Sequence, residues 1–119
     1  MKVLITATNN TLDSSLDARF GRSSWFAVKN TDTGSMEFIE NSQNLNAMQG
    51  AGIQSGQKAI RLGVDAVVTG HVGPKAFKVL NSAGIKIYQA DQLTIEQVIT
   101  RFEQGSLSLM NSADKPGHW

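Results

Sequence analysis

A short apolar segment followed by a glycine turn and a proline constrains the fold of this chain more than any other feature. Residues 64–69 are expected to form a strand that closes at Thr69 and Gly70, and a helix is expected to begin at Pro74. A continuous apolar run fits a parallel strand covered on both faces. Proline suits the first position of a helix because its missing N–H needs no partner there. The pattern therefore predicts an α/β protein with parallel strands.

The turn between this strand and this helix carries groups that suit an anionic ligand. Free N–H groups and the positive end of the dipole at a helix N-terminus favour negative charge. Lys75 in the first turn opposes that dipole, at a small cost in stability unless an anion is near. His71 in the turn could ligate a metal, donate a hydrogen bond to an anion or transfer a proton. The alternative is a loop histidine bonded to a nearby carbonyl.

Composition is typical of a soluble protein with one domain. The chain has 119 residues, of which 40% are hydrophobic and 18% charged, enough for one core and too few for two ordinary domains. No apolar run reaches the length of a membrane span. Met1 and Lys2 lead directly into a strand-like segment, without a separate apolar stretch that ends in a cleavage site. We expect a cytoplasmic protein with no membrane partner.

Charge and cysteine content narrow the classes of ligand. A formal net charge of +1 supplies no broad field for nucleic acid, so no nucleic-acid partner is expected and any anion should be small. The chain contains no cysteine, which excludes disulfides, thiolate catalysis and thiolate anchoring of zinc or iron–sulfur clusters. A metal would have to arrive with its own ligands or use histidine, methionine, asparagine or carboxylates.

The order of the expected elements predicts one mixed sheet of five strands, flanked by helices. Three parallel strands and one antiparallel hairpin are expected, at 3–7, 64–69 and 85–88 and at 25–29 and 36–40. Helices are expected at about 52–62, 74–83 and 94–104. Right-handed crossovers place the hairpin beyond the first strand, so the order is hairpin, first strand, strand 64–69 and strand 85–88. The fold class is therefore α/β.

Two of these helices carry finer signals. Thr94 and Gln97 have the spacing of a capping box at the start of the last helix. Small and apolar residues recur on one face of the first helix and would pack closely on the sheet: Ile53, Gly56, Ile60 and Gly63. Gly63 is also a plausible end of that helix.

The chain divides into an α/β domain at residues 1–105 and a tail at residues 106–119. Periodicity is lost after residue 105, and the tail is expected to be flexible. The alternative is a tail that folds over a site or a partner through its apolar residues, which are Leu107, Leu109, Met110 and Trp119.

Three loops should converge at one edge of this sheet. Connections leave the first strand and strand 64–69 in opposite directions, and ligands settle in the crevice outside the carboxyl ends of such strands. Loops 8–22, 41–52 and 70–74 all reach that crevice. The first of them is long and aperiodic, as functional loops often are.

Side chains in these loops offer further contacts. Arg19 and Arg22 carry guanidinium forks suited to oxyanions; the alternative is an ordinary ion pair with Asp13 or Asp17. Met48 has a soft sulfur that could touch a sulfide-rich or copper-containing ligand, or it fills the rim of the core.

Several segments of the chain together resemble the dinitrogenase iron–molybdenum cofactor biosynthesis family, the NifX, NafY and NifB C-terminal type of domain. They are residues 17–26, 50–53, 63–77 and 83–85, and the similarity extends over about residues 1–105. The resemblance implies a ribonuclease-H-like α/β fold and a protein that binds or carries metal–sulfur clusters. The cysteine-free, stand-alone chain looks most like the orange protein branch, which holds a molybdenum–copper sulfide cluster without covalent attachment.

The resemblance also suggests which residues form the site. It carries over to Phe20, Gly21, Arg22, Gly50, Gly52, Gly70, His71 and Gly73. With Asn10, Met48 and Val72 from the same loops, these are the expected cofactor-binding residues, and His71 is the expected metal contact. The expected function is non-catalytic carriage of an anionic molybdenum-containing sulfide cluster.

Other functions compete with this one. The cargo could instead be the iron–molybdenum cofactor or a precursor, and the protein could act mainly as a module for a partner such as an assembly ATPase. A phosphate or nucleotide sensor would use the 70–74 turn, although no Walker or dinucleotide motif is present. A nuclease would need clustered carboxylates for its metal ions, and residues 1–10 contain no acidic residue.

Overall fold

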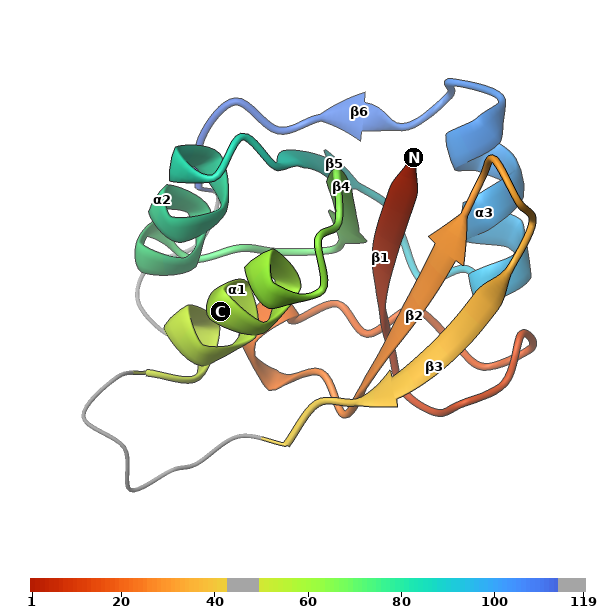
Figure 1. Cartoon of the computed structure of the whole chain (residues 1–119), viewed down its shortest axis with the longest axis horizontal. Helices are drawn as coiled ribbons and strands as arrows, with labels where there is room; N and C mark the ends of the chain where they lie inside the picture. The colour runs from red at the N-terminus through yellow and green to blue at the C-terminus, as the bar shows by residue number, and fades with distance from the viewer. Residues whose placement is uncertain (43–49, 114–119) are drawn as a thin grey trace.

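The computed structural model describes residues 1–42 and 50–113 (Figure 1). Its strands are β1 (Lys2–Ala7), β2 (Trp25–Asn30), β3 (Met36–Glu40), β4 (Ala66–Thr69), β5 (Lys86–Gln89) and β6 (Ser108–Leu109). Its helices are α1 (Ala51–Arg61), α2 (Pro74–Ser82) and α3 (Ile95–Glu103), with a 3-10 turn, η1 (Phe20–Arg22), between β1 and β2. The predicted helices and strands are thus present, and most of their ends differ from the predicted ones by one or two residues.

The six strands form a single sheet in the order β3-β2-β1-β4-β5-β6. β1, β4 and β5 are parallel, and β2 and β3 form the antiparallel hairpin beside β1. These findings confirm the predicted mixed α/β sheet and its order.

The predicted number of five strands is wrong. Residues 108 and 109 pair with the edge of β5, Tyr88 opposite Leu109 and Gln89 opposite Ser108, and Met110 N donates to Ile87 O at 2.8 Å. A strand of two residues is too short to show an alternating pattern, so periodicity could not reveal it. The division of the chain at residue 105 and the ribonuclease-H-like assignment stay predictions.

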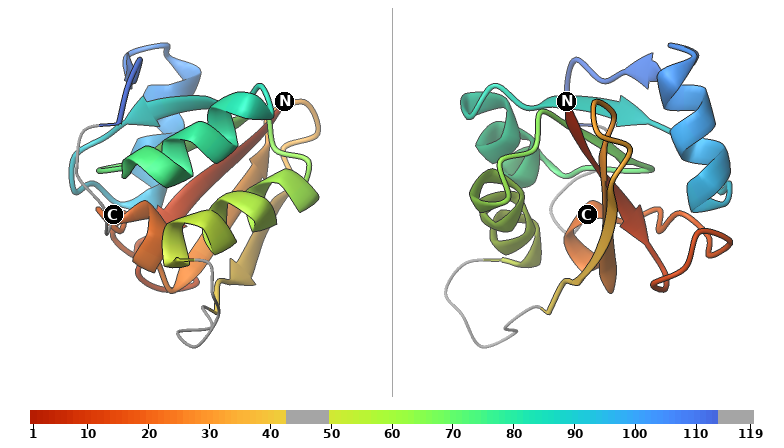
Figure 2. Two further views of the ribbon diagram at one scale, coloured as in Figure 1. Left: turned by 90° about the vertical axis from the view of Figure 1, so that its left-hand side faces the viewer. Right: turned by 45° about the vertical axis from the view of Figure 1, so that its right-hand side comes forward.

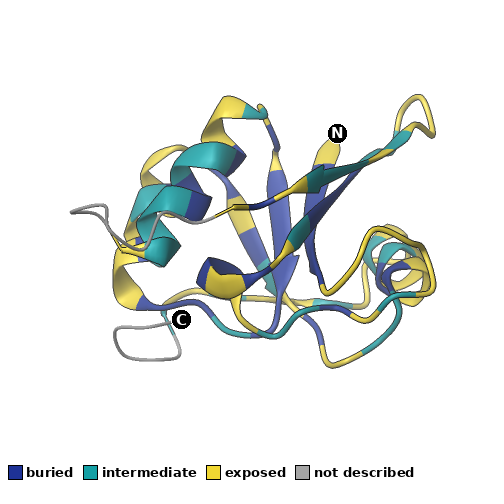
Figure 3. Cartoon of the chain, turned by 90° about the horizontal axis from the view of Figure 1, so that it is seen from below, coloured by how far each residue is buried: buried dark blue, intermediate teal, exposed yellow. Residues whose placement is uncertain are grey.

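Helices cover both faces of the sheet. Figure 2 shows α1 and α2 on one side of it and α3 on the other. Successive side chains of β1 point to opposite faces of the sheet. Leu4 belongs to the core cluster under α1 and α2, whereas Val3 and Ile5 belong to the cluster under α3. The buried strands run between the two layers in Figure 3. Among the described residues, no helix combines the length and the apolar character that a membrane crossing requires.

The face that α1 buries differs from the predicted one. Gly56 is buried as expected, but its burial neighbours are Ser55 and Ala59, and Ile60 is 42% exposed. A Cβ at Gly56 would lie 2.9 Å from Val79 Cγ1, so the glycine permits close packing on α2. Packing against α2 sets which face of α1 is buried, and the periodicity of the α1 sequence alone does not reveal this contact. Gly63, at φ +70°, ends the helix as predicted.

The capping box of α3 is confirmed and makes a stability prediction. Thr94 Oγ1 accepts from Gln97 N at 3.2 Å, and Gln97 Oε1 accepts from Thr94 N at 3.0 Å. Thr94→Ala should lower the free energy of unfolding by about 1 kcal/mol because one of these N–H groups loses its acceptor. Urea unfolding measures the change. Thr100→Ala, an exposed change within the same helix, is the control, and an equal loss in both variants would contradict the assignment.

Candidate functional site

A strap of residues 15–20 lies between the carboxyl ends of β1 and β4. On one side Leu16 pairs antiparallel with Ala7, and Asp17 N donates to Thr6 O at 2.8 Å. On the other side His71 N donates to Ala18 O at 2.7 Å, and Phe20 N donates to His71 O at 3.2 Å. The chain itself therefore occupies the crevice between these two strand ends.

Gly70 makes this arrangement possible. A Cβ at this buried position would lie 2.8 Å from both Ala18 Cα and Ala18 O, a distance that real Cβ contacts do not reach. The strap can approach the end of β4 closely only because residue 70 has no side chain. Gly70 therefore has a steric role in seating the strap, and its predicted contact with a cofactor stays a prediction.

Two adjoining hollows open at the rim of the strap and share Ala18, His71 and Gln92. The larger, of about 380 Å³, is otherwise lined by Thr8, Leu16, Asp17 and Arg19. The smaller, of about 210 Å³, is otherwise lined by Gly70, Gln89, Ala90 and Asp91. We call these two hollows the rim pocket. Its larger part has a volume in the range of small-ligand sites.

Sequence reasoning missed the loop that forms the far wall of the rim pocket. Residues 90–92 follow β5. Gln89, the last residue of β5, donates from Nε2 to Gly70 O at 3.1 Å, which ties this edge to the end of β4. The signal was available, because β5 is the third parallel strand and its carboxyl end must lie at the same edge as those of β1 and β4. Gln92 is therefore a candidate contact that the predicted set omits.

Arg19 is the guanidinium at the rim. Its Nε lies 3.9 Å from Asp17 Oδ1, with side chains 49% and 13% exposed, which confirms the ion pair with Asp17 named as one alternative. Arg19 N also donates to Asp17 Oδ1 at 3.0 Å. At 3.9 Å and with the guanidinium half exposed, this ion pair is weak, so the guanidinium can turn to an anion in the pocket at small cost. Asp91, which lines the smaller hollow, is a carboxylate that opposes such an anion.

The predicted site residues separate into those that line the rim pocket and those that support it. Gly70 and His71 line it. The side chains of Phe20 and Val72 are fully buried in the core under α1 and α2, so only their backbone could reach a ligand. Gly21 and Gly73 are also buried and shape the turns on either side.

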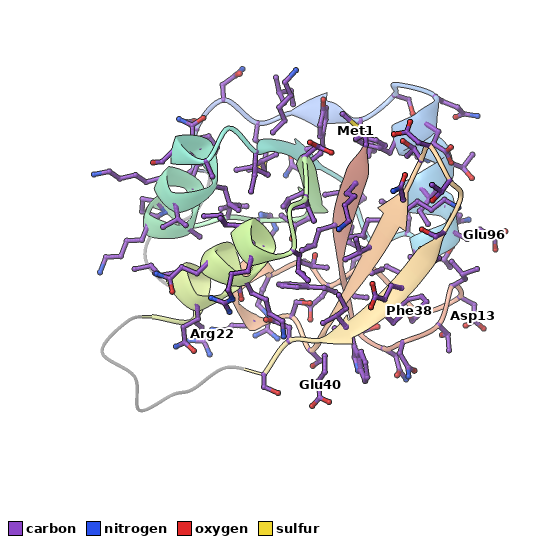
Figure 4. All side chains as sticks on the ribbon, in the orientation of Figure 1. Met1, Asp13, Arg22, Phe38, Glu40 and Glu96 are labelled. Atoms are coloured by element: carbon purple, nitrogen blue, oxygen red, sulfur yellow. The ribbon has the colours of Figure 1, made fainter. Side chains whose placement is uncertain are left out.

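The remaining predicted residues lie away from the rim pocket or outside the described residues. Arg22 is exposed and lies beside α1, far across the molecule from Asp13 (Figure 4), so an ion pair between the two is excluded. Gly50 and Gly52 belong to the start of α1. Asn10 is exposed in a segment whose next turn contacts α3, where Glu96 N donates to Leu12 O at 3.0 Å. Met48 lies outside the described residues.

The helix N-termini differ in how they are satisfied. α1 and α2 begin at Gly50 and Gly73, without a side-chain cap and without an acidic residue in the first turn. α3 has both a capping box and Glu96. Among the described residues, neither α1 nor α2 therefore has a capping side chain or a first-turn carboxylate that would compete with an anion at its N-terminus.

The donor set indicates what kind of metal species the site could accept. Within residues 1–42 and 50–113 no group of three or more His, Cys, Asp or Glu residues could hold a metal ion, and the whole chain lacks cysteine. A bare ion would find no full set of protein ligands there. The guanidinium, imidazole and amide groups of the rim pocket suit a preassembled anion that brings its own ligands.

The contact between Gly70 and the strap makes a second stability prediction. Gly70→Ala should destabilise the protein by about 1–3 kcal/mol because its methyl group must displace the Ala18 backbone. Gly50→Ala is the comparison, since a Cβ at Gly50 meets nothing within 4 Å. Chemical unfolding of both variants measures the difference, and equal stabilities would show that the strap can move away freely.

Known proteins share this architecture. The family model for dinitrogenase iron–molybdenum cofactor matches residues 1–105. A protein of Methanocaldococcus jannaschii without an assigned function is 33% identical over 110 residues, covering 90% of this chain and 89% of its own length. The apo form of the orange protein from Desulfovibrio gigas superposes with a TM-score of 0.89 at 36% identity and 96% coverage of both chains.

A second solved structure agrees with the first. A candidate NifB protein from Thermotoga, solved by NMR, superposes with a TM-score of 0.85 at 28% identity over 98% of both chains. The family model and these relatives each span nearly the whole α/β domain, including the strap and the turn at His71. The chain belongs to the dinitrogenase iron–molybdenum cofactor family.

Proposed function

We propose that this protein is a non-catalytic binder and carrier of an anionic molybdenum-containing sulfide cluster, held without covalent attachment. A molybdenum–copper sulfide cluster is the first candidate. The observation that carries the proposal is the structural match to the orange protein along 96% of both chains. The chain also belongs to a family whose description names the dinitrogenase iron–molybdenum cofactor. We also propose that the carrier works in the cytoplasm and exchanges its cargo with a protein partner.

The chemistry of the rim pocket supports the proposal. A metal–sulfide cluster is anionic and brings its bridging sulfides with it, so the protein needs to supply cations, N–H donors and a partly apolar wall. Arg19 and His71 offer the cationic or N–H groups, and Leu16 and Ala18 contribute apolar surface to the same pocket. Gln92 offers an amide donor on the far side.

The second candidate cargo is the iron–molybdenum cofactor or a precursor. The family description and the likeness to the candidate NifB protein favour it. This cargo would place a heavier demand on His71, because the chain has no cysteine and His71 is the imidazole at the rim pocket. A molybdenum–copper sulfide cluster, already saturated with sulfide, makes a smaller demand on protein ligands.

Anaerobic loading tests the proposal directly. The protein is mixed with tetrathiomolybdate and Cu(I), desalted, and analysed for both metals and for visible absorption. We expect molybdenum and copper to remain in a fixed ratio with a sulfide-to-metal absorption band. Loss of both metals on desalting would refute the molybdenum–copper assignment, and retention of molybdenum with iron from a parallel mixture would favour the second cargo.

His71→Ala tests the imidazole at the rim. The variant should release the cluster about tenfold faster and shift its absorption, because one donor to the cluster is lost. The fold should persist, since the hydrogen bonds of residue 71 to Ala18 and Phe20 come from its backbone. Stopped-flow release and visible spectra are the measurements. Wild-type kinetics with an unchanged spectrum would remove His71 from the site.

A pair of charge changes tests the electrostatics of the pocket with opposite signs. Arg19→Gln should weaken cluster retention and Asp91→Asn should strengthen it, each by a few-fold at low salt and less at high salt. Arg101→Gln on α3, away from the rim pocket, is the matched control and should behave as wild type. Equal effects of Arg19→Gln and Arg101→Gln would show that only net charge matters.

A further inference from the structure

Two buried threonines stand where the strap enters the sheet. Thr6 and Thr69 lie near the carboxyl ends of the paired strands β1 and β4, and both side chains are fully buried. Thr6 Oγ1 is 2.7 Å from Asp17 O and 2.8 Å from Thr69 Oγ1. Thr69 Oγ1 is 3.5 Å from Asp17 O. The residues before them, Ile5 and Val68, are apolar.

The two shorter distances favour one direction for these hydrogen bonds, with Thr6 as the donor to Asp17 O. A hydroxyl has a single proton, and a carbonyl oxygen can only accept. The Thr6 proton therefore goes to Asp17 O, and the Thr69 hydroxyl supplies the proton for the bond between the two side chains. The result is a chain of donors from Thr69 to Thr6 to the Asp17 carbonyl, and hydrogen bonds in such a buried chain reinforce one another.

The same short segment carries the groups that face the rim pocket. Asp17 Oδ1 accepts from Arg19 N at 3.0 Å, and Ala18 O accepts from His71 N at 2.7 Å. A displacement of the Asp17 carbonyl therefore moves the backbone that holds Arg19 on one side and His71 on the other. Arg19 lies two residues after the carbonyl that the threonines hold, and His71 is hydrogen-bonded through its backbone N–H to Ala18, the residue between them.

We propose that Thr6 and Thr69 are positioning residues that hold the strap so that Arg19 and His71 face the cluster in one geometry. The inference rests on the proposed function. Valine would fill the same volume at both positions, yet the chain buries two hydroxyls, which are costly to remove from water unless they are hydrogen-bonded. The hydroxyls supply what valine lacks, a directional hold on a carbonyl of the strap.

The test compares Thr6→Val with the conservative variant Thr6→Ser. Each is measured for anaerobic retention of the cluster formed from tetrathiomolybdate and Cu(I), for the visible circular dichroism of the bound cluster, and for amide exchange of His71 in the unloaded protein. Ile5→Val, a neighbouring buried change that leaves the hydroxyl chain intact, controls for general loss of stability. Thr69→Val serves as the second variant if Thr6→Val does not fold.

We expect Thr6→Val to exchange the His71 amide faster than Ile5→Val, to release the cluster about tenfold faster than wild type and to alter its circular dichroism. Thr6→Ser should restore all three. Thr69→Val should show a smaller effect in the same direction, because the direct bond from Thr6 to Asp17 remains. Wild-type exchange and retention in folded Thr6→Val, or equal effects in Ile5→Val, would overturn the inference.

The two claims fail in different ways. Wild-type protein that retains no cluster would refute the proposed cargo, while the His71 amide would still decide whether the threonines hold the strap. Wild-type protein that retains the cluster, with Thr6→Val indistinguishable from it in all three measurements, would refute the positioning role alone.

Discussion

The hydrogen bond from His71 N to Ala18 O, 2.7 Å long, is the interaction on which the site depends. It joins the long loop after β1 to the turn after β4, two segments that are about fifty residues apart in the sequence. The approach is possible because Gly70 has no side chain to meet Ala18. With that contact in place, the strap fills the crevice between the ends of β1 and β4, and the space open to a ligand lies outside it, in the rim pocket.

Because the strap fills the crevice, the residues that can contact a ligand differ from the predicted set. Phe20 and Val72 become core residues, whereas Arg19, His71 and the loop after β5 surround the open space. The space carries both signs of charge, with Arg19 near one wall and Asp17 and Asp91 nearby. Weak pairing of Arg19 with Asp17 leaves the guanidinium available, which suits a site that must bind a cargo and release it.

Local sequence signals predicted the fold because they act over a few residues. The apolar run, the glycine turn and the proline predicted β4 and the start of α2. The spacing of Thr94 and Gln97 predicted the start of α3. The strap escaped prediction as structure because its partners, Thr6 and His71, lie far away along the chain and impose no period on it. Partners that lie far away along the chain also explain why β6 was not predicted, because its two residues pair with β5. They explain in the same way why the buried face of α1, which contacts α2, was predicted wrongly. Of the residues that the resemblance named, Gly70 and His71 line the rim pocket, whereas the side chain of Phe20 is buried in the core.

X-ray diffraction at the molybdenum absorption edge, from crystals of the anaerobically loaded protein, tests the central claim most directly. We expect an anomalous peak at the rim pocket, between Arg19, His71 and Gln92, with the strap in its present position. A peak elsewhere, for example beside Arg22 at the start of α1, would contradict the placement of the site. A peak inside the crevice between the ends of β1 and β4, with the strap displaced, would contradict the claim that the strap and Gly70 close this crevice.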